Sequence, residues 1–292
     1  MPLSPNIRAS LFMMLSMAGY TINDALIKSL DGALPNAQIM AIRGAVLCLL
    51  ISAVLWQHGL MSRLGELFKP LVGFRAVMEL CATVLYLTAL VQLPFANISA
   101  ILQSLPLAVA IGAALLFNEP IGWRRWLAIA TGFVGVLIII RPGMQGFHSA
   151  SLLVLGCVVL AAGRDLATRA LPPEVPSLLV SMATALLVTL AGVTMLVIQH
   201  SWVAMSLWQF VVLVLAALFL FVGYQCIVLS MRTGDVAFVV PFRYTSLLWA
   251  IGLGYLIFGE VPDSYTLVGS GIVIAMGLFT LYREVLLSRR VS

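Results

Sequence analysis

The chain has 292 residues, of which 62% are hydrophobic and only 9% carry a charge. In soluble domains about a quarter of the residues are charged, so this composition predicts a polytopic membrane protein and excludes a soluble catalytic domain between its apolar segments. The formal net charge of +5 does not indicate nucleic-acid binding, because the basic residues of membrane proteins collect in cytoplasmic loops.

Ten apolar segments are long enough to cross a bilayer as helices, since a crossing takes about 20 apolar residues. Short loops rich in proline, glycine and charge separate these segments. The predicted fold class is therefore an all-α integral membrane protein with ten transmembrane helices in contact with the lipid bilayer. The predicted spans are residues 9–28, 36–56, 70–90, 95–117, 123–140, 149–170, 177–198, 207–231, 236–258 and 265–282.

The basic residues between these spans are distributed unevenly. With a cytoplasmic N-terminus, only Lys28 and Arg141 lie at the outer face. This asymmetry satisfies the positive-inside rule, so we expect a multi-pass protein of the bacterial inner membrane with both termini in the cytoplasm. The basic residues assigned to the cytoplasmic side are Arg8, Arg63, Lys69, Arg124, Arg125, Arg169, Arg232, Arg283, Arg289 and Arg290.

The sequence repeats at a fixed spacing of 141 residues, the difference between positions 24 and 165. Asp24 returns as Asp165, and Lys28 returns as Arg169. Two copies with five spans each, residues 1–146 and 147–292, must enter the bilayer in opposite senses. Inverted repeats of this kind are typical of secondary transporters, which hold substrate near the midplane between the repeats. Further pairs at this offset are Pro35 and Pro176, Ala96 and Ala237, Phe117 and Phe258, and Glu119 and Glu260.

The sequence contains no motif for metal binding, nucleotide hydrolysis or nucleophilic catalysis. Its four cysteines fall in apolar stretches without metal-ligand spacing, and His58, His148 and His200 fall in predicted loops. We therefore expect no enzyme activity, no metal and no cofactor.

Ionisable residues inside the predicted spans are the main site candidates. A charge at the bilayer centre costs at least ~2.5–3.5 kcal/mol, so such residues face a water-filled cavity or pair with one another. The structural alternative is local pairing on one helix, as between Arg75 and Glu79, Asp24 and Lys28, or Asp165 and Arg169. The candidates are Asp24, Arg43, Arg75, Glu79, Arg164, Asp165 and Arg243.

The 141-residue offset distinguishes these candidates. Asp24 and Asp165 are duplicated, as are Glu119 and Glu260, which is typical of gate, coupling or fold elements. An asymmetric substrate needs asymmetric contacts, so we favour four residues that have no charged counterpart as substrate contacts. They are Arg43 (opposite Thr184), Arg75 (opposite Ala216), Glu79 (opposite Leu220) and Arg243 (opposite Leu102).

These charges suit a zwitterion such as an amino acid. A guanidinium binds a carboxylate through two parallel hydrogen bonds, and a glutamate accepts from an ammonium. Other side chains of the cavity would wall a pocket or orient polar groups; the alternative role for each is helix packing. These are Tyr86, Gln103, Tyr224, Tyr244 and Trp249.

The chain resembles the drug/metabolite transporter superfamily in its ten-span form with two EamA repeats. The resemblance rests on Leu93-Pro94-Phe95-Ala96, Leu105-Pro106-Leu107 and Phe117-Asn118-Glu119, and on their counterparts Thr233-Gly234-Asp235-Val236-Ala237 and Phe258-Gly259-Glu260. It implies a carrier, with most similarity to bacterial amino-acid exporters, while importers of S-adenosylmethionine or riboflavin share the pattern. One departure is that Pro106 corresponds to Leu247, with Pro241 earlier in that span.

We therefore expect a secondary carrier that exports amino acids by alternating access, as a monomer or a homodimer. Uptake of S-adenosylmethionine or riboflavin is the alternative within carriers. An integral-membrane enzyme would need metal ligands or a nucleophile at one interface, and a channel would need a ring of charges or carbonyls from an oligomer.

Overall fold

The computed structural model describes residues 4–116, 122–142, 147–172, 174–233 and 239–291. Within these ranges all regular secondary structure is helical, as the apolar segments predicted. The first half contains α1 (Pro5–Lys28), α2 (Asn36–Gln57), η1 (Leu60–Phe68), α3 (Pro70–Leu90), α4 (Phe95–Leu102), α5 (Leu105–Leu116) and α6 (Trp123–Ile140). The second half contains α7 (Ala150–Arg169), α8 (Ser177–Gln199), α9 (Leu207–Thr233), η2 (Val240–Tyr244), α11 (Thr245–Phe258) and α12 (Ser264–Val291).

Length and composition qualify six helical stretches of the described chain as membrane spans. Two more, Trp126–Ile140 and Ser264–Thr280, are apolar but shorter. The first predicted span is not among these helices, because Asn23, Asp24 and Lys28 near the end of α1 lower its hydropathy. The ninth predicted span is not among them because η2 interrupts it and leaves α11 too short. The count of ten spans therefore stays a prediction.

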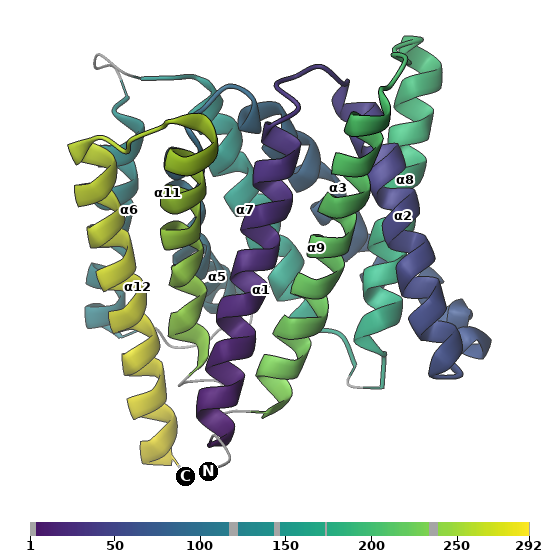
Figure 1. The fold of residues 1–292 in the computed structure, drawn as a ribbon. Helices are drawn as coiled ribbons and strands as arrows, with labels where there is room; N and C mark the ends of the chain where they lie inside the picture. The colour runs from purple at the N-terminus through teal and green to yellow at the C-terminus, as the bar shows by residue number, and fades with distance from the viewer. Residues whose placement is uncertain (1–3, 117–121, 143–146, 173, 234–238, 292) are drawn as a thin grey trace.

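The helices run up and down through a single bundle, with both termini at the same end (Figure 1). We call this end the terminal end and the other the distal end. Helix α1 packs along α9, and α3 packs along α7. Under the offset of 141 residues α1 corresponds to α7 and α3 corresponds to α9, so the α1–α9 pair corresponds to the α3–α7 pair. Helices α2 and α8 form another pair, as do α6 and α12, and the offset maps each of these pairs onto itself.

Small residues allow the paired helices to approach closely. A Cβ added at Gly19 of α1 would lie 2.9 Å from the Phe219 carbonyl oxygen of α9, and one added at Gly269 of α12 would lie 2.6 Å from the Gly135 carbonyl oxygen of α6. Polar bonds reinforce the first contact, because Ser16 donates to the Gly223 carbonyl at 2.8 Å. Close approach and hydrogen bonds of this type hold membrane helices together where lipid provides no hydrophobic driving force.

The fourth and ninth predicted spans are broken in the middle. Helix α4 ends at Leu102 and α5 begins at Leu105, where Pro106 provides no backbone donor for the carbonyl four residues earlier. The second break joins η2 to α11 at Tyr244, the position that corresponds to Gln103 under the offset. The two helix breaks therefore lie at corresponding positions in the two halves. The nearby prolines do not correspond, because Pro106 comes after the first break and Pro241 comes before the second. The Gln103 amide connects them by donating to the Ser246 hydroxyl at 2.8 Å.

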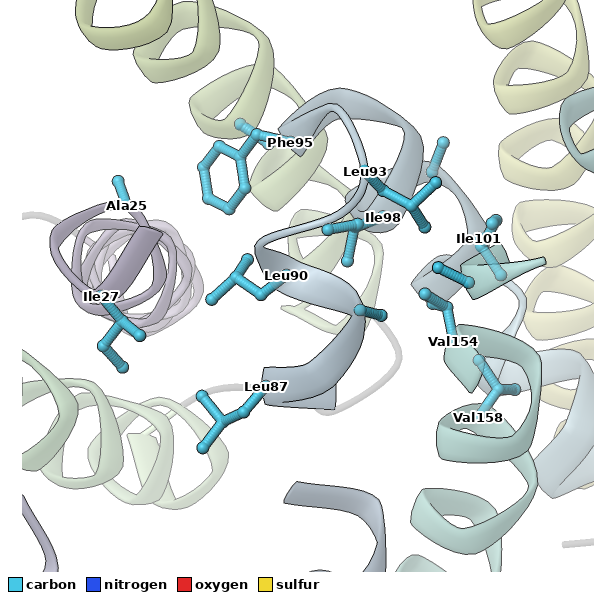
Figure 2. Packing of buried hydrophobic residues seen from close by; sticks show 14 of the residues in the cluster. Ala25, Ile27, Leu87, Leu90, Leu93, Phe95, Ile98, Ile101, Val154 and Val158 are labelled. Atoms are coloured by element: carbon cyan, nitrogen blue, oxygen red, sulfur yellow. The ribbon is translucent and has the colours of Figure 1, made fainter. Parts of the chain in front are cut away.

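The largest cluster of buried apolar side chains surrounds the start of α4 (Figure 2). Phe95, Ile98 and Ile101 of α4 meet Leu87 and Leu90 from the end of α3. Val154 and Val158 of α7 complete the cluster from the second half. This apolar packing stabilises the distal end of the bundle. The charged side chains of the bundle interior lie between this cluster and the terminal end.

Candidate functional site

Two carboxylates and one guanidinium meet between α3 and α7. Arg164 Nη1 lies 2.6 Å from Glu79 Oε2, and Arg164 Nε donates to Asp165 Oδ1 at 2.8 Å. The side chains of Arg164, Glu79 and Asp165 remain 20%, 16% and 28% exposed. The charge network therefore lies between helices and is largely but not fully buried.

Arg75 of α3 bonds to hydroxyl groups. Its Nε donates to Thr168 of α7 at 2.9 Å, and its Nη1 donates to Thr184 of α8. The ion pair of Glu79 is with Arg164 and not with Arg75, so the local pair considered from their spacing is wrong. The reason is that both side chains turn toward neighbouring helices, where stronger or closer partners lie.

A second polar group lies nearer the distal end, between α1, α2 and α3. Asn23 accepts from Arg43 Nη1 at 3.3 Å and donates to Asp24 Oδ1 at 2.8 Å. Tyr86 on α3 lies within electrostatic range of Asp24. Arg43 is buried, with 9% exposure. The Asn23 amide thus holds a cation and an anion next to each other.

Aromatic side chains lie beside these charges. Tyr20 of α1 and Tyr224 of α9 meet edge to face, with ring centroids 5.6 Å apart and an interplanar angle of 78°. Tyr224 lies within electrostatic range of Glu79 and Arg43. These rings therefore border both charged groups.

Together the two groups contain three guanidiniums and three carboxylates. Along α3, Tyr86, Glu79 and Arg75 follow one another from the distal toward the terminal end, so the charges form a series through the bundle. A balanced series of this kind lowers the cost of each charge in the membrane.

The remaining predicted cavity residues lie elsewhere. Gln103 connects the two helix breaks. The Tyr244 hydroxyl points to Gly277 of α12, where an added Cβ would collide with it. Trp249 is 43% exposed, and Arg243 on η2 lies within electrostatic range of Tyr20.

An ion pair at the distal end joins α1 to the end of α11. Lys28 Nζ lies 2.9 Å from Glu260 Oε1, and the other Glu260 oxygen accepts from the backbone N–H of Phe95 at 2.6 Å. Lys28 also donates to the Leu93 carbonyl and lies over the Phe258 ring, 5.3 Å from its centroid. The Asp24–Lys28 pair predicted as one alternative is therefore wrong, because Lys28 turns to the second half. We call Lys28, Glu260, Phe95 and Phe258 the distal lock; Glu119, the predicted counterpart of Glu260, lies outside the described residues.

A cavity of about 570 Å³ lies at the distal lock. Its lining includes Lys28, Asp31, Gln92, Pro94 and Glu260. The lock therefore forms the floor of a polar recess at this end.

A second distal contact joins α6 to α12. Arg141 pairs with Asp263 and lies over the Tyr265 ring, 4.3 Å from its centroid. Burial acts to raise the pKa of Asp263, but hydrogen bonds from Arg141 and from the Thr266 N–H, at 2.8 Å, outweigh it, so this pKa lies below its ordinary value. At the terminal end, hydrogen bonds from Lys69 and Arg63 likewise lower the pKa of Glu66.

Sequence reasoning missed four partners of the charged residues: Tyr20, Asn23, Thr168 and Thr184. The offset provided a signal for two of them, because Asn23 corresponds to Arg164 and Thr184 corresponds to Arg43. Within the described ranges, no three histidine, cysteine or acidic side chains gather in a way that could hold a metal ion.

Comparison with known proteins gives one family. The profile of the EamA-like transporter family matches residues 7–141 and again residues 148–282. A solved crystal structure superimposes with a TM-score of 0.65 at 18% identity, covering 97% of this chain and 98% of that one, which shows a shared fold.

Curated relatives that span nearly the whole chain are transporters. A riboflavin transporter of Vibrio cholerae is 26% identical, with 97% of this chain and 96% of the relative covered. An S-adenosylmethionine uptake transporter of Rickettsia felis is 24% identical, with 94% and 92% covered. The pseudopaline exporter CntI of Pseudomonas aeruginosa is 26% identical, with 94% and 95% covered.

Proposed function

Since this chain belongs to the EamA-like transporter family, we propose that it is a secondary carrier for a small zwitterion, foremost an amino acid that it exports across the bacterial inner membrane. The observation that carries this proposal is the balanced series of three guanidiniums and three carboxylates between the helices. Partly accessible side chains of both signs suit a substrate that carries both signs itself.

The carrier works by alternating access between two inverted repeats, residues 1–146 and 147–292, with ten spans. The packing supports this arrangement, because the offset exchanges the α1–α9 and α3–α7 pairs and preserves the α2–α8 and α6–α12 pairs. The coincident helix breaks support it as well, since broken helices at a repeat interface are typical of transporter binding sites.

The distal lock acts as a gate on one side. It joins the first half to the second through Lys28 and Glu260, so it must open if substrate is to leave or enter at that end. Asp24 and Asp165 are the candidates for coupling, and Glu119 is the candidate for the corresponding gate at the terminal end. With the basic residues taken as cytoplasmic, the lock lies on the periplasmic side.

Uptake of riboflavin, S-adenosylmethionine or a related metabolite is the second candidate function. It is favoured by the relatives named for these substrates and by the Tyr20–Tyr224 pair, which offers aromatic surface to a planar ring.

The test is counterflow in proteoliposomes. Purified protein is loaded with one unlabelled compound, and uptake of labelled amino acids, riboflavin and S-adenosylmethionine is measured against empty liposomes. Exchange of amino acids supports the first proposal. Exchange of riboflavin alone replaces it with the second, and exchange of S-adenosylmethionine alone, which carries the same free ammonium and carboxylate groups, keeps the zwitterion site but changes the substrate. A panel without any exchange contradicts both.

A further inference from the structure

The three interior arginines differ in how their donors are satisfied. A guanidinium has five N–H donors. Arg164 binds two carboxylates, and Arg75 binds two threonine hydroxyls. Arg43 makes one hydrogen bond to the described part of the chain, a long contact of 3.3 Å to Asn23, although it is buried. No Arg43 nitrogen is among the fully buried, unpartnered polar atoms of the described residues, so its remaining N–H groups keep some accessible surface, and Arg43 has the most bonding capacity of the three for a ligand.

The surroundings of Arg43 supply the opposite charge. Asn23 binds Arg43 through its carbonyl oxygen and Asp24 through its amide nitrogen. The Asp24 carboxylate is hydrogen-bonded by the Asn23 amide and lies within electrostatic range of Arg43, whereas Glu79 and Asp165 form direct ion pairs with Arg164. A cation and an anion are thus held side by side, and each keeps bonding capacity.

The repeat supports the same distinction. The positions of Asn23 and Arg43 return in the second half as Arg164 and Thr184. There they are occupied by bonds within the protein, Arg164 to two carboxylates and Thr184 to Arg75. These two positions are therefore occupied by bonds within the protein in the second half, whereas in the first half Arg43 keeps N–H groups available for a ligand.

The site also lies next to the gate. Asp24 is one turn before Lys28 on α1, and Lys28 belongs to the distal lock. Opening the lock would therefore uncover Asp24 and Arg43 before the Arg164 network.

We propose that Arg43 binds the carboxylate of the substrate and that Asp24 binds its ammonium group, so that the substrate class is the α-amino acid with both groups free. Arg75 and Arg164 are positioning residues that hold α3 against α7 and α8. This inference rests on the proposed function and divides its charged residues into ligand contacts and framework.

The test compares four forms of the amino acid that gives the strongest counterflow: the free acid, its carboxamide, the amine without the carboxylate and the carboxylic acid without the amino group. Each competes with the labelled acid for exchange in proteoliposomes. For the wild type we expect the acid to compete at least about tenfold better than the carboxamide, since a charge-assisted bidentate bond is lost. In Arg43→Gln this preference should fall to about one, while Arg43→Lys should retain part of it. Asp24→Asn should instead abolish the preference for the amino acid over its deaminated carboxylic acid.

Arg75→Gln is the matched control, because it neutralises another interior arginine whose guanidinium already makes two hydrogen bonds to threonine hydroxyls. It should change the amount of exchange but keep the tenfold preference for the acid. If Arg43→Gln keeps the preference, or if Arg75→Gln loses it, the assignment of Arg43 is wrong while the carrier function stands. If no compound with a free α-ammonium and α-carboxylate exchanges, S-adenosylmethionine included, the proposed substrate class fails and this assignment fails with it. Ligand-induced shifts in Tm, measured for each variant in detergent, separate loss of binding from loss of folding.

Discussion

Lys28 and Glu260 lie near opposite ends of the sequence and form an ion pair of 2.9 Å at the distal end of the bundle. The same glutamate accepts the backbone N–H of Phe95, so α1, α4 and α11 meet at one carboxylate. Because the pair connects the two halves, its rupture is the simplest way to open this end.

Glu260→Gln should favour opening at the distal end. Glutamine keeps an oxygen for the Phe95 N–H but loses the charge that holds Lys28, a change worth up to about 1 kcal/mol, or about fivefold in population, for a partly exposed pair. The measurement is the labelling rate of Cys157, a buried thiol near Glu79 and Asp24, by a membrane-impermeant reagent added at the distal face. The other three cysteines are replaced by alanine. Glu66→Gln, which breaks ion pairs at the terminal end, is the control and should leave this rate unchanged.

Arg164→Gln should destabilise the protein strongly. The substitution leaves Glu79 and Asp165 without their shared cation, and loss of one partner of a buried pair costs about 3–5 kcal/mol. Thermal unfolding in detergent should show a clear loss of Tm for this variant and a partial recovery in Arg164→Gln combined with Glu79→Gln. An unchanged Tm in the single variant would show that the network contributes nothing to folding.

Proton coupling should depend on Asp24 more than on Glu79. Asp24 is hydrogen-bonded by Asn23, and Arg43 lies only within electrostatic range, so protonation of Asp24 breaks no direct ion pair with the described residues, whereas Glu79 is paired with Arg164. An imposed pH gradient should drive efflux from proteoliposomes in the wild type and in Glu79→Gln, and it should have no effect in Asp24→Asn. A response that survives in Asp24→Asn would exclude this carboxylate, and no response in the wild type would indicate uncoupled transport.

The Arg141–Asp263 contact should stabilise the protein only above acidic pH. The pKa of Asp263 is lower in the folded protein than its ordinary value of 3.8. The stabilisation is therefore fully present above the unfolded pKa and is lost as the pH falls through the folded pKa. Asp263→Asn should lower Tm near neutral pH, and the difference from the wild type should shrink below about pH 4. Arg141→Gln should give the same profile; a difference independent of pH would show that the ion pair is not its cause.

Both termini should lie in the cytoplasm. The structure places them at one end of the bundle (Figure 1), and the excess of basic residues predicts which side this is. Fusions of fluorescent and phosphatase reporters to each end test the orientation. Phosphatase activity at either terminus would overturn it.

Much of the fold was predictable because it follows from local chemistry. The apolar segments predicted the helical class, and the repeated motifs predicted the transporter family, both of which are confirmed. The ion pairs were not predictable from spacing, because Glu79 and Lys28 turn away from neighbours on their own helices toward Arg164 and Glu260. Such choices depend on which helices lie side by side, and helical periodicity contains no information about that.

Helices α2 and α8 correspond to each other under the offset, and they also touch. In an assembly of two identical five-helix chains this contact would be isologous, with the same surface used twice. The α6–α12 contact joins corresponding helices in the same way. In a single chain the two sides of such a contact are free to differ, and Arg43 and Thr184 stand at matching positions with different chemistry.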